Sequence, residues 1–193
     1  MLQINVTIAL VHALADYGHY VQPFLSDARG WTVGDGNDQY AEMSIFYAEE
    51  YDINAVKAAV ADYAIDRTYS SDIEKVSFSL LMDTDTSIYL YFKPVSGYTG
   101  GFTVDGYTAT KQSDGRYLVK IPNIGADKLG TTYTVVATTD AGSTTVKVSA
   151  LSYVKGVLDA YTTDSEKDVH AQNAAAAIYR YYAAANAYKQ VHP

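Results

Sequence analysis

The residues best spaced for metal chemistry are His12, Asp16 and His19. Their spacing of i, i+4 and i+7 places all three on one face of a helix. Two imidazoles and a carboxylate on such a face could hold zinc, with water or another side chain completing the coordination. The alternative is a polar outer face on which Asp16 bonds a neighbouring histidine. We expect this alternative and no metal site, because no fourth ligand is visible and catalytic zinc helices usually carry a glutamate beside the histidine.

Two segments are rich in the oxygen ligands that calcium prefers. The run that begins at Asp83 starts like an EF-hand loop, which needs glycine at its sixth position and glutamate at its twelfth. Those positions hold Ile88 and Pro94, so we expect a hairpin turn there. Residues 34–38 (Gly-Asp-Gly-Asn-Asp) fit a calcium loop better, and a solvated turn is the alternative for them.

The sequence offers little for catalysis. It contains no cysteine, which excludes disulfides, thiolate zinc sites and a thiol nucleophile. It has no Gly-x-Ser-x-Gly elbow, and the glycine-rich residues 97–101 lack the lysine and the following helix of a phosphate loop. His170 and His192 lie in or beyond a terminal helix, where nothing supports a catalytic triad. We therefore expect a protein that is not an enzyme and needs no cofactor.

Aromatic side chains are the better candidates for function, because the chain has 19 tyrosines. Tyrosine combines a large apolar ring with a hydroxyl group, which suits interfaces. If residues 88, 90 and 92 face a core, Tyr89 and Tyr91 point together to the other side of the sheet. There they could stack on sugar rings or anchor a protein interface, unless a helix covers that face and buries them. The candidate ligand-binding residues are Tyr89, Tyr91, Tyr98, Tyr107 and Trp31.

The sequence pattern places most of these tyrosines in a β-rich segment. Residues 74–148 alternate apolar and polar side chains in short runs, separated by turn signals at Asp105-Gly106, Asp114-Gly115 and residues 140–142. Six or seven short strands in this length favour an immunoglobulin-like antiparallel β-sandwich. Residues 129–135 are similar to the corner where such domains place a tyrosine. No cysteine pair or core tryptophan accompanies them, so an antibody-type domain in the strict sense is excluded.

The two ends of the chain have helical patterns. A helix is predicted from about residue 4, and Pro23 should end or bend it. We expect an ordered loop from Asp27 to Gln39, and then a short helix with Asp52 as its N-cap. The apolar stripe of the first helix consists of Val6, Leu10, Ala13, Leu14, Tyr17, Val21 and Phe24.

The last helix is predicted to begin at an Asp164 or Ser165 cap. It is alanine-rich, and between residues 171 and 188 its only charge is Arg180. Because alanine lets helices approach closely, the first helix is its expected partner, and the chain ends should meet in a small bundle. We therefore predict an α+β fold, a single module over residues 1–193. The β-sandwich would span 74–148, packed against a helical part formed by 1–73 and 149–193.

The composition of the chain excludes several classes of binding partner. The net charge is −8 and the pI is about 4.8, so general nucleic-acid binding is excluded. No apolar run approaches the roughly 18 residues that a spanning helix needs, so we expect no membrane insertion. Charged residues make up 19% of the chain, which is below the usual quarter. A tyrosine-rich, weakly charged composition recurs in extracellular modules of bacterial surface proteins.

Several stretches resemble a repeated module of large secreted surface proteins of gut clostridia, of the kind found in Lachnospiraceae and Ruminococcaceae. The stretches that carry the resemblance are residues 13–18, 87–94, 117–126, 148–154 and 174–188. They are descriptive of a fold and contain no catalytic motif. The resemblance implies adhesion or ligand capture outside the cell, and some related proteins bind immunoglobulin variable domains in the manner of superantigens.

The expected function is therefore that of a non-enzymatic extracellular binding module, monomeric within a longer chain. Its ligand would be a host protein such as an immunoglobulin variable region. One alternative is a carbohydrate-binding module that stacks glycans on Tyr89 and Tyr91 or on Trp31. The other is a structural spacer that only projects neighbouring domains.

Overall fold

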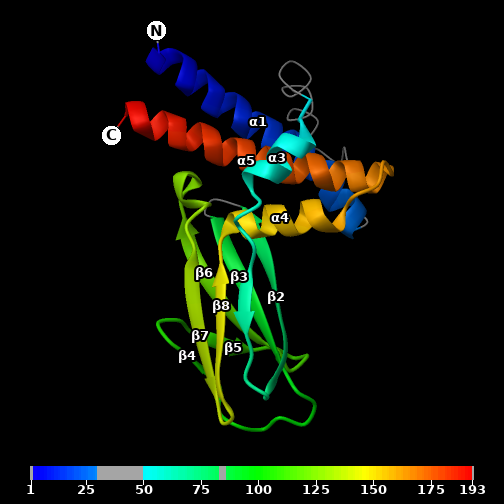
Figure 1. Ribbon diagram of the computed structural model, residues 1–193, viewed down its shortest axis with the longest axis vertical. Coiled ribbons are helices and arrows are strands. Elements are labelled where there is room, and N and C mark those ends of the chain that lie inside the picture. The colour runs from blue at the N-terminus through cyan, green and yellow to red at the C-terminus, as the bar shows by residue number, and fades with distance from the viewer. Residues whose placement is uncertain (1, 30–49, 83–85, 193) are drawn as a thin grey trace. The chain divides into compact units, whose positions relative to one another are not determined.

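The computed structural model describes residues 2–29, 50–82 and 86–192, and divides into two compact units (Figure 1). A helical unit contains residues 1–62 and 154–193, and a sheet unit contains residues 63–153. Helices at both ends of the chain and antiparallel sheets between them make the fold α+β, as expected.

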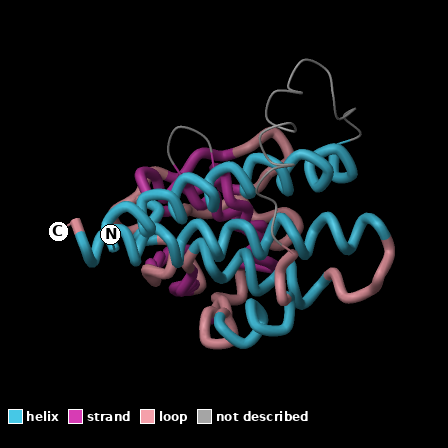
Figure 2. Tube along the Cα trace, turned by 90° about the horizontal axis from the view of Figure 1, so that it is seen from above, coloured by secondary structure: helices cyan, strands magenta, loops and turns pink. Residues whose placement is uncertain are grey.

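The helical unit is built on two long helices from opposite ends of the sequence. Helix α1 (Leu2–Arg29) and helix α5 (Glu166–Val191) run antiparallel and side by side (Figures 1 and 2). The short helix α3 (Ile53–Ala59) also contacts α5. Helix α4 (Ala150–Ala160) begins in the sheet unit and ends in the helical unit. The expectation that the two chain ends meet is confirmed.

Helices α3 and α5 begin at the predicted N-cap residues. The Asp52 carboxylate accepts a hydrogen bond from the Ala55 backbone N–H, and the Ser165 hydroxyl accepts one from the Asp168 N–H. Such bonds satisfy N–H groups that a first helical turn leaves without partners. Along α5 the small side chains face the interior. The buried alanines are Ala171, Ala174, Ala175, Ala176, Ala177 and Ala185.

Helix α1 differs from its prediction in two respects. It continues through Pro23 to Arg29, so Pro23 does not end it, and the expectation that a loop starts at Asp27 is wrong. Proline removes one backbone donor, and a helix of this length that packs along a partner retains enough other bonds to continue. Leu14, predicted on the buried stripe, is 52% exposed. Because α1 is apolar on more than one face, the stripe alone did not identify the face that contacts α5.

The sheet unit contains two antiparallel sheets of four strands, an arrangement compatible with a β-sandwich. One sheet has the order β1-β8-β7-β4 and the other has the order β2-β3-β6-β5. The first sheet comprises β1 (Asp66–Thr68), β4 (Thr103–Val104), β7 (Tyr133–Thr139) and β8 (Gly142–Val148). The second comprises β2 (Ile73–Met82), β3 (Thr86–Pro94), β5 (Ala109–Lys111) and β6 (Tyr117–Ile124).

The core of this unit follows the predicted alternation. Every second residue of the central strands is buried, because successive side chains of a strand point to opposite faces of its sheet. In the second sheet these residues are Val76, Ile88, Leu90, Phe92, Val119 and Ile121, and in the first they are Val135, Ala137, Val146 and Val148.

Tight turns join several of these strands at the predicted glycines. Gly106, Gly115 and Gly142 all have positive φ angles, of 73°, 82° and 120°. Glycine adopts this conformation without the steric cost that a side chain would add. Strands β1 and β5 were not predicted, because each spans only three residues without an apolar alternation. Pairing with β8 and β6 defines them.

Candidate functional site

The outer face of the β2-β3-β6-β5 sheet carries the two tyrosines singled out in the sequence. On β3, Tyr89 and Tyr91 alternate with Ile88, Leu90 and Phe92, which are fully buried. The two tyrosines are half-buried. The prediction that they share the face away from the core is therefore confirmed.

A cation lies over each of these tyrosine rings. The Arg116 guanidinium carbon is 4.7 Å from the centre of the Tyr91 ring, and the Lys120 ammonium nitrogen is 5.7 Å from that of Tyr89. Both cations belong to or directly precede strand β6, which pairs with β3. Contacts of this kind are attractive because the ring face carries partial negative charge. We call the surface formed by Tyr89, Tyr91, Arg116, Leu118 and Lys120 the tyrosine face.

An ion pair at one end of the tyrosine face fixes the position of Arg116. The Arg116 Nη2 lies 2.6 Å from Asp114 Oδ2, and the Arg116 Nε donates to the same oxygen at 2.8 Å. The hydrogen bond with Arg116 lowers the pKa of Asp114, and the same bond raises the pKa of Arg116. The guanidinium is thereby held over Tyr91 by the turn between β5 and β6.

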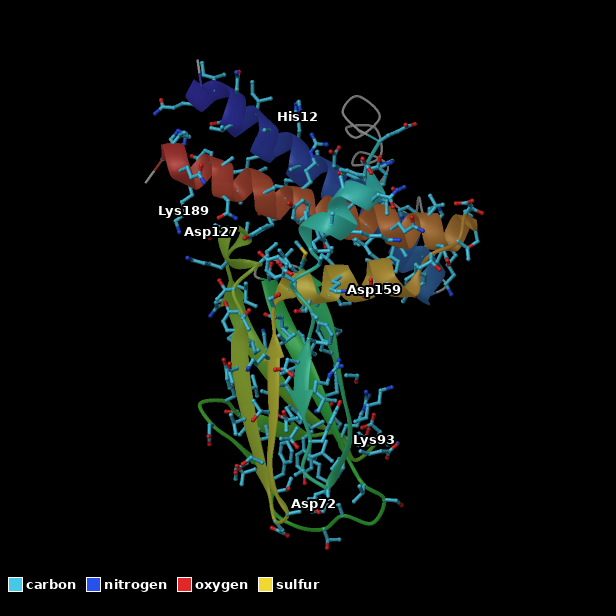
Figure 3. The ribbon with its side chains drawn as sticks, viewed as in Figure 1. His12, Asp72, Lys93, Asp127, Asp159 and Lys189 are labelled. Carbon is cyan, nitrogen blue, oxygen red and sulfur yellow. The ribbon has the colours of Figure 1, made fainter. Side chains whose placement is uncertain are left out.

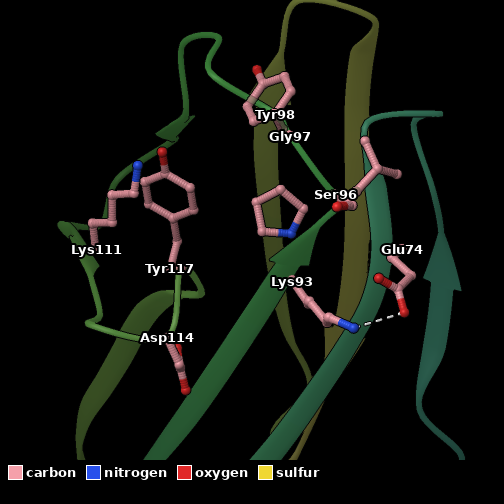
Figure 4. A pocket seen from close by; sticks show the side chains of 11 residues that line it. Glu74, Lys93, Ser96, Gly97, Tyr98, Lys111, Asp114 and Tyr117 are labelled. Carbon is pink, nitrogen blue, oxygen red and sulfur yellow. Dashed lines mark hydrogen bonds and ion pairs between the residues drawn. The ribbon is translucent and has the colours of Figure 1, made fainter.

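Next to this face, at the end of the sheet, is a pocket of about 330 Å³ (Figure 4). It lies between the segment that follows β3 and the turn that joins β5 to β6. Lys93, which lies toward the same end of the sheets as Asp72, is ion-paired with Glu74 at 2.8 Å (Figure 3). The lining side chains that carry charge or an aromatic ring are Glu74, Lys93, Tyr98, Lys111, Asp114 and Tyr117.

Tyr98 lines this pocket and also closes its loop. Its hydroxyl donates to the Gly101 carbonyl at 2.5 Å and accepts from the Asp140 N–H at 3.4 Å. The preceding Gly97 has a φ of 79°, which lets the chain turn at this point. The candidate Tyr98 is thus brought near the end of the tyrosine face by the strand that carries Tyr91.

Of the other two aromatic candidates, Tyr107 is described by the structure and lies elsewhere in the sheet unit. Tyr107 lies in the segment between β4 and β5, and its neighbour in space is Tyr133 at the start of β7. Burial raises the pKa of Tyr133, and the nearby Tyr107 phenol raises it further. Trp31 lies outside the described residues, as do the calcium candidate at 34–38 and Asp83 to Asp85.

Asp16, the carboxylate of the candidate metal set on α1, is paired with Arg180. The Asp16 side chain is 0% exposed, and its Oδ2 accepts from Arg180 Nη1 at 2.6 Å and from the Tyr51 hydroxyl at 3.3 Å. The expectation that Asp16 lies on a polar outer face is therefore wrong. Among residues 2–29, 50–82 and 86–192, no group of three His, Asp or Glu side chains could hold a metal ion.

The neighbouring phenols of Tyr51 and Tyr20 are also affected by this cluster. Their own burial is the main cause of the raised pKa of both tyrosines, and the negative charge of Asp16 raises it further. The Arg180 guanidinium opposes the shift at both tyrosines. Sequence reasoning missed this cluster, although the isolated charge of Arg180 in an alanine-rich helix was a usable signal. A buried charge requires a partner of opposite sign, and Asp16 supplies it.

Comparisons of the chain with models of protein families, with curated proteins and with solved structures found no match. None of the described helices combines the length and the apolar character that crossing a bilayer requires.

Proposed function

We propose that this chain is a non-enzymatic extracellular binding module of a bacterial surface protein, and that it binds a protein partner through the tyrosine face. The observation that carries the proposal is the pairing of two half-buried tyrosines with Arg116 and Lys120 on one sheet face. Tyrosine and arginine are the residue types that most often anchor protein interfaces. The ligand we propose is a host protein such as an immunoglobulin variable region.

The cations favour a protein over a glycan as the ligand of this face. A sugar that stacks on tyrosine needs an open ring face, and here Arg116 and Lys120 each lie over one ring. The chain has a net charge of −8, so basic groups gathered beside the tyrosines mark a local exception. A partner with acidic groups at its contact surface is complementary to this arrangement.

The ion pairs of the carboxylates near the pocket support the non-enzymatic part of the proposal. Glu74 is held by Lys93 and Asp114 by Arg116, so both carboxylates near the pocket are engaged in ion pairs. A general base requires a carboxylate or imidazole directed at a substrate proton. These carboxylates serve instead to hold cations in place.

The strand order supports an immunoglobulin-like description of the two sheets. Immunoglobulin constant domains pair strands A-B-E-D in one sheet and C-F-G in the other. Labelling β2 to β8 as A to G gives the orders β2-β3-β6-β5 and β4-β7-β8, with β1 added beside β8. Tyr133 opens β7, the strand where such domains place their corner tyrosine. The resemblance to modules of gut clostridial surface proteins is consistent with this interpretation.

The proposal is tested by surface plasmon resonance against pooled immunoglobulin fragments and a panel of mucosal proteins. We expect binding that Tyr91→Ala weakens about thirtyfold, because anchor tyrosines contribute about 2 kcal/mol or more. Lys120→Ala should weaken it less, and the matched Lys147→Ala, on the other sheet, should leave it unchanged. Lys147 is exposed and paired with Asp66, which makes it a suitable control.

Three results would contradict the proposal. Binding that Tyr91→Ala leaves unaltered would place the interface elsewhere. If no protein of the panel binds, the spacer alternative is favoured. If the chain binds a glycan on an array and Tyr89→Ala abolishes that binding, a glycan ligand on this face is favoured.

A further inference from the structure

We propose that the chain forms a weak, two-fold symmetric dimer through the edge of strand β2, so that the β2-β3-β6-β5 sheets of two copies join into one. This surface is not used by the proposed function, and such a dimer would replace the expectation of a monomeric module. A strand at the border of a sheet presents backbone N–H and C=O groups that can pair with another strand. Strand β2 is such a border strand, because among the described strands it pairs with β3 alone (Figure 1).

Strand β2 differs from the other border strands in its length and composition. Strands β1, β4 and β5 span three, two and three residues, whereas β2 spans ten. Proteins usually protect a long edge with charged side chains, proline, a bulge or a covering segment. Residues 76–82 (Val-Ser-Phe-Ser-Leu-Leu-Met) contain no charge, proline or glycine, and the register irregularity of β2 lies before them, between Ile73 and Lys75. This part of the edge therefore lacks the usual protection against pairing.

A hydrogen bond near the start of β2 shows which of its backbone groups face outward. The Val76 N–H donates to the Tyr69 hydroxyl at 3.4 Å, so this N–H points away from β3. Inward and outward backbone groups alternate along an antiparallel pair, and the register from Val76 to Met82 is regular. The N–H and C=O groups of Phe78 and Leu80 therefore also point away from β3. In the described part of the chain, no backbone group pairs with them on this side.

A second copy of β2 fits this edge in an antiparallel register centred on Ser79. Phe78 then lies opposite Leu80 of the second copy, and the two residues exchange their backbone hydrogen bonds. The side chains of Phe78 and Leu80 are only half-buried, although their neighbours on β3, Leu90 and Ile88, are fully buried. An apolar pair of Phe78 and Leu80 across the new boundary would extend the core where a single copy leaves it partly exposed.

The outer side of the edge and its charge also favour a second copy. In this register Leu81, which is 41% exposed, lies opposite Ser77 of the second copy, and Ser79 lies opposite its own counterpart. The net charge of −8 makes two copies repel each other, whereas residues 76–82 are neutral. Two-fold symmetry produces a contact that closes at two copies. Because the pairing of one strand buries less area than a standard interface, the dimer should be weak.

Sedimentation velocity of the full chain tests the dimer. We expect the average mass to rise from that of one copy, 21.0 kDa, toward twice that value as the concentration passes a dissociation constant of about 100 μM. Ser79→Lys should weaken this association about tenfold or more, because two ammonium groups then face each other across the two-fold axis. The matched control is Thr110→Lys, which adds the same charge at an exposed position of β5, the other border of the sheet. It should leave the association unchanged.

Hydrogen exchange of the parent chain provides a second measurement that needs no variant. The amide protons of Phe78 and Leu80 should exchange more slowly at about 1 mM than at about 10 μM, because pairing protects them from solvent. A mass that stays at one copy up to 1 mM, association that Ser79→Lys leaves unchanged, or exchange of these amides that is independent of concentration would each overturn the proposal. If only added immunoglobulin fragments slow their exchange, the edge binds the proposed partner protein instead, and the dimer is contradicted.

Discussion

At the scale of single residues, the ion pair of Asp16 and Arg180 shows how one buried charge constrains a helix pair. Asp16 lies in α1 and Arg180 in α5, and the pair closes at 2.6 Å with Asp16 fully buried. The Tyr51 hydroxyl adds a further donor to the same oxygen. A buried pair of this kind contributes little net stability compared with apolar side chains, but removing one member is costly. It therefore favours one alignment of α1 on α5 over others.

This arrangement predicts the effect of removing the guanidinium. Arg180→Met should lower the free energy of unfolding by about 3 kcal/mol, because the Asp16 carboxylate stays buried without its main partner. Urea denaturation at neutral pH measures the change. The double variant Asp16→Asn/Arg180→Met should lose less than the sum of the two single variants. Additive losses would show that the two side chains do not act as a pair.

At the scale of elements, the start of α5 is organised around Asp168. Its Oδ2 accepts hydrogen bonds from the backbone N–H groups of Thr162 and Thr163 and from the Thr163 hydroxyl, at 2.8–3.0 Å. These bonds, with that of the Thr163 backbone first, lower the pKa of Asp168. A single carboxylate thereby ties the connection from α4 to the first turn of α5.

The lowered pKa gives this element a pH dependence with a definite sign. The ionised form is favoured in the folded state, so its contribution is complete above the unfolded pKa of about 4 and declines as the pH falls through the folded value. The stability difference between the parent chain and Asp168→Asn should therefore be present at pH 7 and shrink at acidic pH. Urea unfolding at several pH values measures it.

Glu166→Gln is the matched control for this measurement, because Glu166 lies in the same helical turn. It should show a smaller change with pH. If the difference in unfolding free energy between Asp168→Asn and the parent chain is the same at neutral and acidic pH, the ionised Asp168 carboxylate does not stabilise the start of α5.

At the scale of the whole molecule, the helical unit depends on segments from both ends of the sequence. Helices α1 and α5 pack together although the sheet unit lies between them in the chain. The sheet unit has its own core of fully buried side chains on β3, β6, β7 and β8. Each unit has buried apolar side chains of its own, and loss of one helix should affect the two units differently.

Truncation after Thr163 tests this dependence. The truncated chain lacks α5, so α1 loses the helix it packs against and Asp16 loses its ion pair with Arg180. We expect the far-ultraviolet circular dichroism to lose more helix than α5 alone supplies, while methyl signals of Leu90 and Val119 remain dispersed in NMR spectra. Retention of helical α1 in the truncated chain would show that its packing on α5 is dispensable.

Much of the local structure could be predicted, because it depends on neighbours in the sequence. The alternation around Tyr89 and Tyr91 identified both the buried and the outer side chains of β3. The turn at Asp114-Gly115 and the cap at Ser165 depend on backbone conformations that a few residues determine. The immunoglobulin-like arrangement, the ligand and the extracellular setting stay predictions.

The candidate sites could be predicted only in part. Tyrosine spacing placed Tyr89 and Tyr91 on one face, but the cations over them come from β6, and only the pairing of β3 with β6 brings them there. The pocket joins residues that follow β3 to the β5–β6 turn in the same way.

The sequence by itself determined which side chains alternate, where the chain turns and which segments are helical, because these features depend on the local backbone. Only the tertiary structure decided that Asp16 meets Arg180 and that Arg116 and Lys120 lie over the rings of Tyr91 and Tyr89. The physical reason is that burial and electrostatic pairing depend on distance in space. Residues far apart in a sequence carry no local signal of the neighbours that folding gives them.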